Sequence, residues 1–387
     1  LEKNNYGKSP TEIEIDYVWQ LKTPKTTYQL NISNAYKETE YNFKSTFGII
    51  DKTIKKKNLY FGESFIKHNF SNSTFIRLGK YYRDFSGYLN DDLSSGSMLV
   101  SKNAQPMPKI GLVTSYKLKK NQNINFKFGI AHGFFDKNNY YTDKPPFLHE
   151  KFLYLNVIRD NSEYGIGFVH EAIWAGATEE SGNFPSSFND FLKVLISADG
   201  DYEGGPHANA LGNHLGIWDF YYKKKKNNQI LKLYYQHFFE DTSSLRFRNE
   251  IDGLWGIEIE NYIENTTILF EYLDTTNSFL DPPYQADFYY WNYQYRIGWR
   301  YRNNTIGNPF VNPNNEKKFI KLFHVGIKGE INSNYYSIKA SRDIKIGDDI
   351  LYKIILGRKL KNNLNFNLFI VNNGINNGSG IGINYVF

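Results

Sequence analysis

Acidic residues that lie close together in the chain are the first candidates for catalysis. Glu240 and Asp241 are adjacent, and Glu250 and Asp252 follow within the same polar segment. Two carboxyl groups hydrolyse a glycosidic bond when they flank it at a defined separation and one of them has a raised pKa. The sequence specifies neither condition, and the two arginines between these acids are typical of a solvated loop. We therefore predict no catalytic pair and no enzyme.

Residues of the types that bind metal ions occur between positions 199 and 237. They are His207, His214 and His237, with Asp199, Asp201 and Glu203. Calcium requires a dense array of oxygen ligands, and zinc requires closely placed histidines or cysteines. The pair Asp199 and Asp201 is too short a match, and the chain has no cysteine. We predict no metal ion and no other cofactor, because the chain also lacks a phosphate-binding glycine loop and a nucleophile motif around Ser186 and Ser187.

Aromatic and charged residues of the second half of the chain could instead bind a sugar. The tryptophans are Trp174, Trp218, Trp255, Trp291 and Trp299, and the charged residues are Arg246, Arg248, Asp219 and Asp252. The face of an indole ring suits the C–H face of a sugar, and an arginine fork suits the carboxylate of a uronic acid. Packing in an aromatic belt explains most of these tryptophans equally well. If a polysaccharide site exists, cations and rings are concentrated at Arg246, Arg248, Asp252, Trp255, Asp219 and Trp218, and we predict it there.

The composition favours a membrane barrel over a soluble domain. Aromatic residues make up 17% of the 387 residues, although the mean hydropathy is only −0.55. Aromatic belts at the two membrane interfaces account for such an excess. No apolar run is long enough for a membrane helix, whereas a barrel needs only strands of about 9 to 11 residues. The net charge of +6 is compatible with acidic glycans, and no nucleic-acid-binding module is recognisable.

Alternating apolar and polar residues recur through the chain and predict β-strands. In the last segment Ile381, Ile383 and Tyr385 share one face, as in strands with lipid on one side and a polar lumen on the other. About eighteen such segments can be counted, among them 28–36, 41–50 and 59–68. The chain is therefore predicted to be all-β, a transmembrane antiparallel β-barrel of about eighteen strands.

The connections between the predicted strands are alternately short and long. The long segments lie near 83–108, 132–150, 174–214, 240–252 and 275–317. In outer-membrane barrels the short turns are periplasmic and the long loops extracellular, and an even number of strands places both ends of the chain in the periplasm. The alternation from Tyr289 to Tyr301 would add a strand and break this parity. It predicts either a twenty-stranded barrel or, as we prefer, a hairpin within an extracellular loop.

One helix is predicted inside the longest loop. Between Pro185 and Ile196 the apolar residues follow helical spacing after serine and proline start signals. The apolar stripe of this helix must be covered, so we expect its loop to fold over or into the lumen as part of a plug. No break in composition separates a second domain, and residues 1–387 are predicted to form one barrel domain.

Several blocks of the sequence resemble the capsule assembly Wzi family. In chain order they are Leu93 to Gly96, Ser101 to Ile110, Gly165 to Glu171, Trp174 to Gly176, Gly212 to Asp219, Tyr235 to Asp241, Asp252 to Gly256, Phe270 to Tyr272 and Gly307 to Phe310. The blocks span roughly residues 93 to 310, and their order is more specific than any one of them. Barrels of this family can carry a periplasmic helical bundle, for which the residues before Thr11 are too few, so we expect no bundle here.

The resemblance implies an eighteen-stranded outer-membrane barrel, closed on the outside by folded loops, with no catalytic activity. It implies a lectin-like role, in which the protein binds capsular or exopolysaccharide and helps to hold it at the cell surface. The expected partners are this polysaccharide, outer-membrane lipids and other outer-membrane proteins or lipoproteins, with no nucleic acid. The expected location is the bacterial outer membrane, after removal of a secretory signal. Two alternatives remain open, namely a diffusion porin whose charged residues line water and a scaffold subunit of a larger outer-membrane complex.

Overall fold

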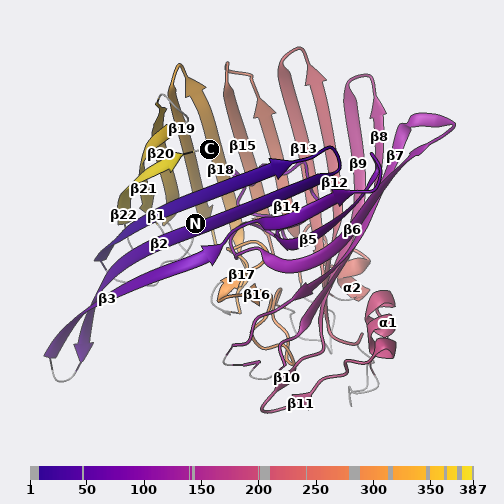
Figure 1. Cartoon of the computed structure of the whole chain (residues 1–387), viewed down its shortest axis with the longest axis horizontal. Helices are drawn as coiled ribbons and strands as arrows, with labels where there is room; N and C mark the ends of the chain where they lie inside the picture. The colour runs from indigo at the N-terminus through magenta and orange to yellow at the C-terminus, as the bar shows by residue number, and fades with distance from the viewer. Residues whose placement is uncertain are drawn as a thin grey trace.

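The structure is a large antiparallel β-barrel with loops folded into one end (Figure 1). The computed structural model describes residues 8–45, 48–138, 140–141, 144–198, 200, 210–240, 242–278, 288–312, 317–345, 349–360, 364–372 and 377–385. Within these residues the wall of the barrel is one sheet of eighteen strands. The prediction of an all-β barrel with about eighteen strands is confirmed.

The wall strands follow one another in chain order. They are β1 (Lys8–Lys22), β2 (Thr26–Ser45), β3 (Gly48–Phe61), β4 (Ser64–Asn69), β5 (Thr74–Tyr81), β6 (Met107–Leu118), β7 (Asn121–Phe134), β8 (Phe147–Arg159), β9 (Ser162–Trp174), β12 (Asn213–Lys226), β13 (Gln229–Phe239), β14 (Gly253–Glu260), β15 (Thr266–Asp274), β18 (Lys321–Ile331), β19 (Asn334–Asp343), β20 (Ile350–Lys359), β21 (Leu364–Asn372) and β22 (Asn377–Tyr385). The loops contain the hairpins β10 (Ala177–Thr178) with β11 (Gly182–Asn183) and β16 (Arg300–Tyr301) with β17 (Asn304–Thr305), and the helices α1 (Phe188–Ile196) and α2 (Thr242–Leu245). Neither helix of the described residues has the length and hydropathy needed to cross a membrane.

Alternation with a period of two residues sets the two faces of the wall. In β8, Phe152 and Tyr154 are each 4% exposed, whereas Leu153 between them is 51% exposed. In β6, Leu112 is likewise exposed and the neighbouring Val113 is buried. Exposed apolar residues therefore face outwards, and buried ones face the lumen, where other parts of the chain cover them.

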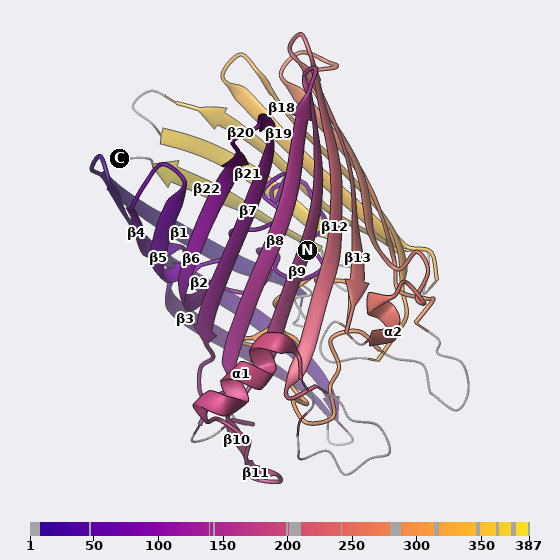
Figure 2. The same ribbon diagram turned by 90° about the vertical axis from the view of Figure 1, so that its right-hand side faces the viewer.

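Each wall strand pairs with the next wall strand along the chain, with β3 and β4 counted together as one strand position. β9 pairs with β12 across the longest loop, and β15 pairs with β18 across residues 275–320. β1 and β22 lie side by side, with Cα atoms within 8 Å of each other (Figures 1 and 2). This contact brings the two ends of the sheet together.

The first strands differ from the predicted ones. Instead of separate strands at 28–36 and 41–50, the structure has the single strand β2, in which Glu38 pairs with Thr11 on one side and Lys55 on the other. The charged segment 37–40 stays in the sheet because its backbone groups have partners on both sides. β3 and β4 both pair with β2, one after the other along its length, so together they occupy one strand position in the wall. β1 consequently begins at the end with the long loops, so the predicted placement of the N-terminal end on the side of the short turns is wrong. β22 ends at Tyr385 beside Leu364, on the side of the short turns, as predicted for the C-terminal end.

The alternating stretch from Tyr289 to Tyr301 is not a wall strand. It contains turns and leads into the small hairpin of β16 and β17, within the loop between β15 and β18. The preferred interpretation, a hairpin within a loop, is therefore confirmed against a twenty-stranded wall. Several aromatic side chains of this stretch are buried, since Tyr290, Tyr295 and Trp299 are only 0 to 2% exposed, whereas Tyr293 is 46% exposed.

Two loops fill one end of the barrel and form a plug, which we define as residues 82–106 and 288–312. Leu93, Met98 and Leu99 of the first loop and Trp299 of the second are all 0% exposed. These residues belong to one hydrophobic cluster with lumen-facing side chains of the wall. The main core of the protein thus lies inside the barrel, as predicted for a plugged lumen.

The predicted helix is present, but it lies on the outer face of the wall (Figure 2). Ser187 caps its N-terminus, where the Ser187 side chain accepts a hydrogen bond from Asp190 N and the Asp190 side chain accepts one from Ser187 N. Val194 and Phe191 pack against Trp174, whose side chain points away from the lumen. We expected this helix over or inside the lumen. The plug already fills that space, and the outer ends of β8 and β9 provide the apolar cover instead.

Candidate functional site

The plug is held together by hydrogen bonds between its two loops. The indole nitrogen of Trp299 donates to Leu99 O at 2.7 Å, and the hydroxyl of Tyr290 donates to Met98 O. All four residues are buried. Loops that are far apart in the sequence therefore fold as one unit.

A buried carboxylate of the wall attaches the first loop of the plug. Asp219, predicted as a sugar ligand, is 0% exposed in β12. It accepts hydrogen bonds from Ser86 Oγ at 2.5 Å, from the Tyr154 hydroxyl at 2.5 Å and from the Tyr88 hydroxyl. With three donors and no solvent contact, this carboxylate serves to hold the plug.

A second carboxylate of the wall, that of Glu271, also attaches the first loop of the plug. Glu271 of β15 accepts hydrogen bonds from Ser94 Oγ at 2.6 Å, from Ser95 N at 2.6 Å and from the Tyr234 hydroxyl at 2.5 Å. Glu271 lies in a block of family resemblance, Phe270 to Tyr272, and had no predicted role. Its lumen-facing position in an alternating strand is the one sequence signal that could have identified it.

A third carboxylate attaches the second loop. Asp252 directly precedes β14 and is 0% exposed. It accepts hydrogen bonds from the Tyr289 hydroxyl at 2.7 Å, from Asn277 N at 3.0 Å and from Asn277 Nδ2 at 2.9 Å. Burial raises the pKa of Asp252 to about 6, although these hydrogen bonds act in the opposite direction. Asp252 therefore also stabilises the plug from inside the protein.

The two predicted tryptophans lie on the outer face of the wall. Trp218 packs edge-on against Phe168, with ring centroids 4.9 Å apart, and its indole nitrogen donates to Leu245 O at 3.2 Å. Trp255 stacks on Tyr235 with ring centroids 3.7 Å apart and remains 39% exposed. Both positions match an aromatic belt, which is the alternative to a sugar site.

The two predicted arginines, Arg246 and Arg248, are exposed on the turn that follows α2. Between them, Phe247 stacks on His237 with ring centroids 4.1 Å apart and faces Trp218 at 6.3 Å. This stacking places the turn against the outer wall, at the end of the barrel that carries the long loops. Two cations are thereby presented to solvent beside an aromatic surface, an arrangement suited to an anionic group.

The six predicted residues therefore fall into two groups. Arg246, Arg248, Trp218 and Trp255 lie on the outside, where Tyr235 and His237 connect the Trp255 ring to the arginine turn, and Asp219 and Asp252 lie inside. The sequence could not separate the groups, because neighbours in a strand point to opposite faces.

The acidic pair considered for catalysis lies partly outside the described residues, which do not include Asp241. The carboxylate of Glu240 accepts a hydrogen bond from Tyr290 N at 2.6 Å, so it too contacts the plug. Glu250 is exposed on the turn before β14.

The histidines considered as metal ligands do not converge. His214 Nδ1 lies 2.9 Å from His170 Nε2, whereas His237 Nε2 lies 2.9 Å from Ser244 O. His207, Asp199, Asp201 and Glu203 fall outside the described residues. Within the part of the chain that the structure describes, no group of three or more His, Asp or Glu side chains is arranged to hold a metal ion.

A polar cavity of about 840 Å³ lies in the lumen on the side of the short turns. Its lysines are Lys328, Lys339, Lys353 and Lys359, and the plug contributes Asp91 and Asp92. Lys328 forms an ion pair with Asp92 at 3.1 Å, whereas Lys339 and Lys353 stand directly opposite each other on β19 and β20. Glu330 also lines the cavity and forms an ion pair with Lys359 at 2.5 Å, so the cavity carries charges of both signs.

The family model of the capsule assembly protein Wzi matches residues 12–322, most of the chain. The chain belongs to the capsule assembly protein Wzi family. This membership makes it a non-enzymatic protein of the bacterial outer membrane with a part in capsule assembly, and the resemblance seen in the sequence is confirmed. The outer face of the barrel is therefore its lipid-contacting surface.

Solved structures of outer-membrane proteins are similar to this chain at low sequence identity. OmpT of Vibrio cholerae is 8% identical, with a TM-score of 0.27, and the match covers 95% of this chain and 85% of that chain. OccAB1 of Acinetobacter baumannii is 11% identical, with a TM-score of 0.30, and the match covers 91% of this chain and 97% of that chain. No curated protein matches the sequence.

Proposed function

We propose that this protein, acting as one barrel domain over residues 1–387, binds acidic capsular or exopolysaccharide at the cell surface and helps to assemble or retain it there. The observation that carries the proposal is the plug, anchored by the buried carboxylates Asp219, Asp252 and Glu271. A lumen filled in this way is unsuited to free diffusion, whereas firmly held loops present a fixed surface to a polymer.

In this proposal four of the six predicted residues form or support the binding surface, and the other two hold the loops in position. Arg246 and Arg248 bind carboxylates of the polysaccharide, and the exposed ring of Trp255 packs against a sugar face. Trp218 positions the arginines through its hydrogen bond to Leu245 O. Asp219 and Asp252 position the loops and do not contact the ligand.

Binding of purified host polysaccharide to the folded protein tests the proposal. The double variant Arg246→Gln/Arg248→Gln is expected to weaken binding about tenfold or more, because each charge-assisted hydrogen bond contributes on the order of 1.5–3 kcal/mol. The control is Arg159→Gln, which removes the same charge from an 81% exposed side chain beside a short turn. Absence of binding by the unaltered protein, or an equal loss in the control, contradicts the proposal.

The main alternative is a diffusion porin, which planar-bilayer conductance separates from a polysaccharide receptor. We expect no steady open-channel steps, because buried side chains of two loops occupy the lumen. Steady conductance that polysaccharide does not block would favour the porin.

A further inference from the structure

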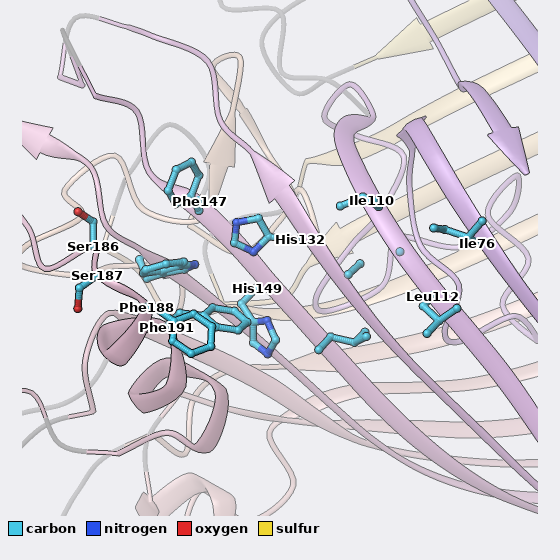
Figure 3. A pocket seen from close by; sticks show the side chains of 14 residues that line it. Ile76, Ile110, Leu112, His132, Phe147, His149, Ser186, Ser187, Phe188 and Phe191 are labelled. Atoms are coloured by element: carbon cyan, nitrogen blue, oxygen red, sulfur yellow. The ribbon is translucent and has the colours of Figure 1, made fainter.

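An apolar groove of about 570 Å³ runs along the outer face of the wall beside α1 (Figure 3). Figure 3 shows Ile76 and Leu112 towards one end of the groove, and Phe191 of the helix towards the other. The apolar lining includes Ile76, Ile110, Leu112, Ile130, Trp174 and Phe191. The groove thus extends from the N-terminal half of α1 across the strands β8 to β5.

The groove is continuous with the lipid-contacting surface of the barrel. Ile110, Leu112 and Ile130 are 41 to 42% exposed and belong to the outward-facing rows of β6 and β7. Apolar side chains in these rows normally contact hydrocarbon. The natural occupant of a groove that opens from this surface is therefore an apolar part of a lipid.

The position of α1 indicates which leaflet supplies the lipid. The helix lies at the end of the wall that carries the long loops, which is the extracellular end in this class of barrel (Figure 2). Phe188, Leu192 and Ile196 are spaced four residues apart and are 73%, 42% and 73% exposed, so α1 also presents apolar side chains to its surroundings. Such a helix is stable at a membrane interface, here that of the outer leaflet.

A cation of the wall holds the end of this helix in place. The Lys151 ammonium donates a hydrogen bond to Leu195 O in the last turn of α1. A positive charge at a helix C-terminus is favourable, because the last carbonyl groups carry partial negative charge. The helix side of the groove is therefore fixed and not a loosely attached segment.

A histidine in the groove points to the polar part of the ligand. His149 is 0% exposed and lines the groove, with its ring 5.5 Å from that of Phe191. Neither ring nitrogen of His149 has a hydrogen-bond partner among the described residues. Buried polar groups are normally satisfied, so the occupant is expected to bring a donor or an acceptor. The ester, amide and hydroxyl groups at the head of a lipid acyl chain meet this requirement.

We propose that this groove binds one acyl chain of a lipopolysaccharide molecule of the outer leaflet, with a polar group at the head of the chain hydrogen-bonded to His149. The bound lipid packs between α1 and the wall and fixes the barrel to the leaflet on which capsule is assembled. This inference does not depend on the polysaccharide-binding proposal, because the groove does not include Arg246, Arg248 or Trp255.

The test measures the lipid that stays with the protein after extraction from outer membranes in mild detergent. Native mass spectrometry counts bound lipids, and fatty-acid analysis identifies them. We expect about one lipopolysaccharide molecule per unaltered chain. Leu112→Trp, which fills the groove with an apolar side chain, is expected to reduce retention about tenfold. The matched control Leu153→Trp alters an outward residue that is 51% exposed and does not line the groove, and it should retain the lipid.

A second variant tests the polar contact. His149→Phe keeps an aromatic ring beside Phe191 and removes both nitrogens, so we expect reduced lipopolysaccharide retention with unchanged heat resistance of the folded barrel. Retention equal to that of the unaltered protein overturns the His149 contact. The groove assignment itself is overturned by absence of bound lipid, by equal losses in the two tryptophan variants, by phospholipid as the retained lipid, or by a second protein chain in its place.

Discussion

Asp252 makes the stability of the plug depend on pH. Its side chain is 0% exposed and accepts hydrogen bonds from the Tyr289 hydroxyl and from Asn277, both in the connection between β15 and β18. Burial raises its pKa from 3.8 to about 6. The substitution Asp252→Asn removes the titrating group and keeps the size of the side chain.

The sign and size of the effect follow from this pKa. The folded protein binds the proton of Asp252 more tightly than the unfolded chain does. The stabilisation from this group is therefore complete below about pH 3.8 and is lost as the pH rises through about 6. At about 1.36 kcal/mol for each unit of pKa, the difference amounts to roughly 3 kcal/mol of unfolding free energy.

Denaturant unfolding in detergent micelles, followed by tryptophan fluorescence at a series of pH values, measures this effect. We expect the unfolding free energy of the unaltered protein to fall by roughly 3 kcal/mol between pH 4 and pH 6.5. The unfolding free energy of Asp252→Asn should fall much less over the same range. Asp160→Asn is a matched control, because the Asp160 side chain is 87% exposed beside a short turn. An equally steep loss in Asp252→Asn, or a flat profile in the unaltered protein, refutes the reasoning.

Three further substitutions test the anchoring of the plug and the wall. Asp219→Ala leaves three hydroxyl donors without their acceptor, so we expect the unfolding free energy to fall by several kcal/mol and channel steps to appear in planar bilayers. A variant that still shows no conductance would contradict this role of Asp219. Lys109→Met breaks a buried ion pair with Glu150 at 2.8 Å and should cost about 3–5 kcal/mol, whereas a change below about 1 kcal/mol would show that the pair is not needed. Gly253→Ala places a Cβ atom 2.0 Å from Gln236 O at a φ of +134°, so this variant should fold poorly, while Gly87→Ala, with nothing within 4 Å, serves as the neutral control.

The wall of the barrel was predictable because its signal is local. A strand between lipid and a polar lumen alternates at every residue, as Phe152, Leu153 and Tyr154 do, so a short window of sequence is enough to recognise it. The helix start was predictable for the same reason, since the Ser187 and Asp190 cap lies within four residues.

The position of each functional side chain was not predictable, because it depends on contacts between distant residues. Asp219 holds Ser86, which is 133 residues away in the chain, and no local pattern reveals that pairing. The apolar stripe of α1 showed that the helix had to be covered, but not which face of the wall would cover it. Trp218 and Asp219 are neighbours in sequence, yet one faces outwards and the other faces the plug.

The hydrogen bond from Trp299 to Leu99 spans 200 residues, and its two ends belong to loops on different parts of the wall. We expect such a contact to form late, because closing a loop of this length costs more entropy than pairing neighbouring strands. The barrel is thus expected to assemble before its plug. In that order of assembly the lumen stays open until the two loops enter it, so we expect the rate of their entry to set how long each new copy leaks.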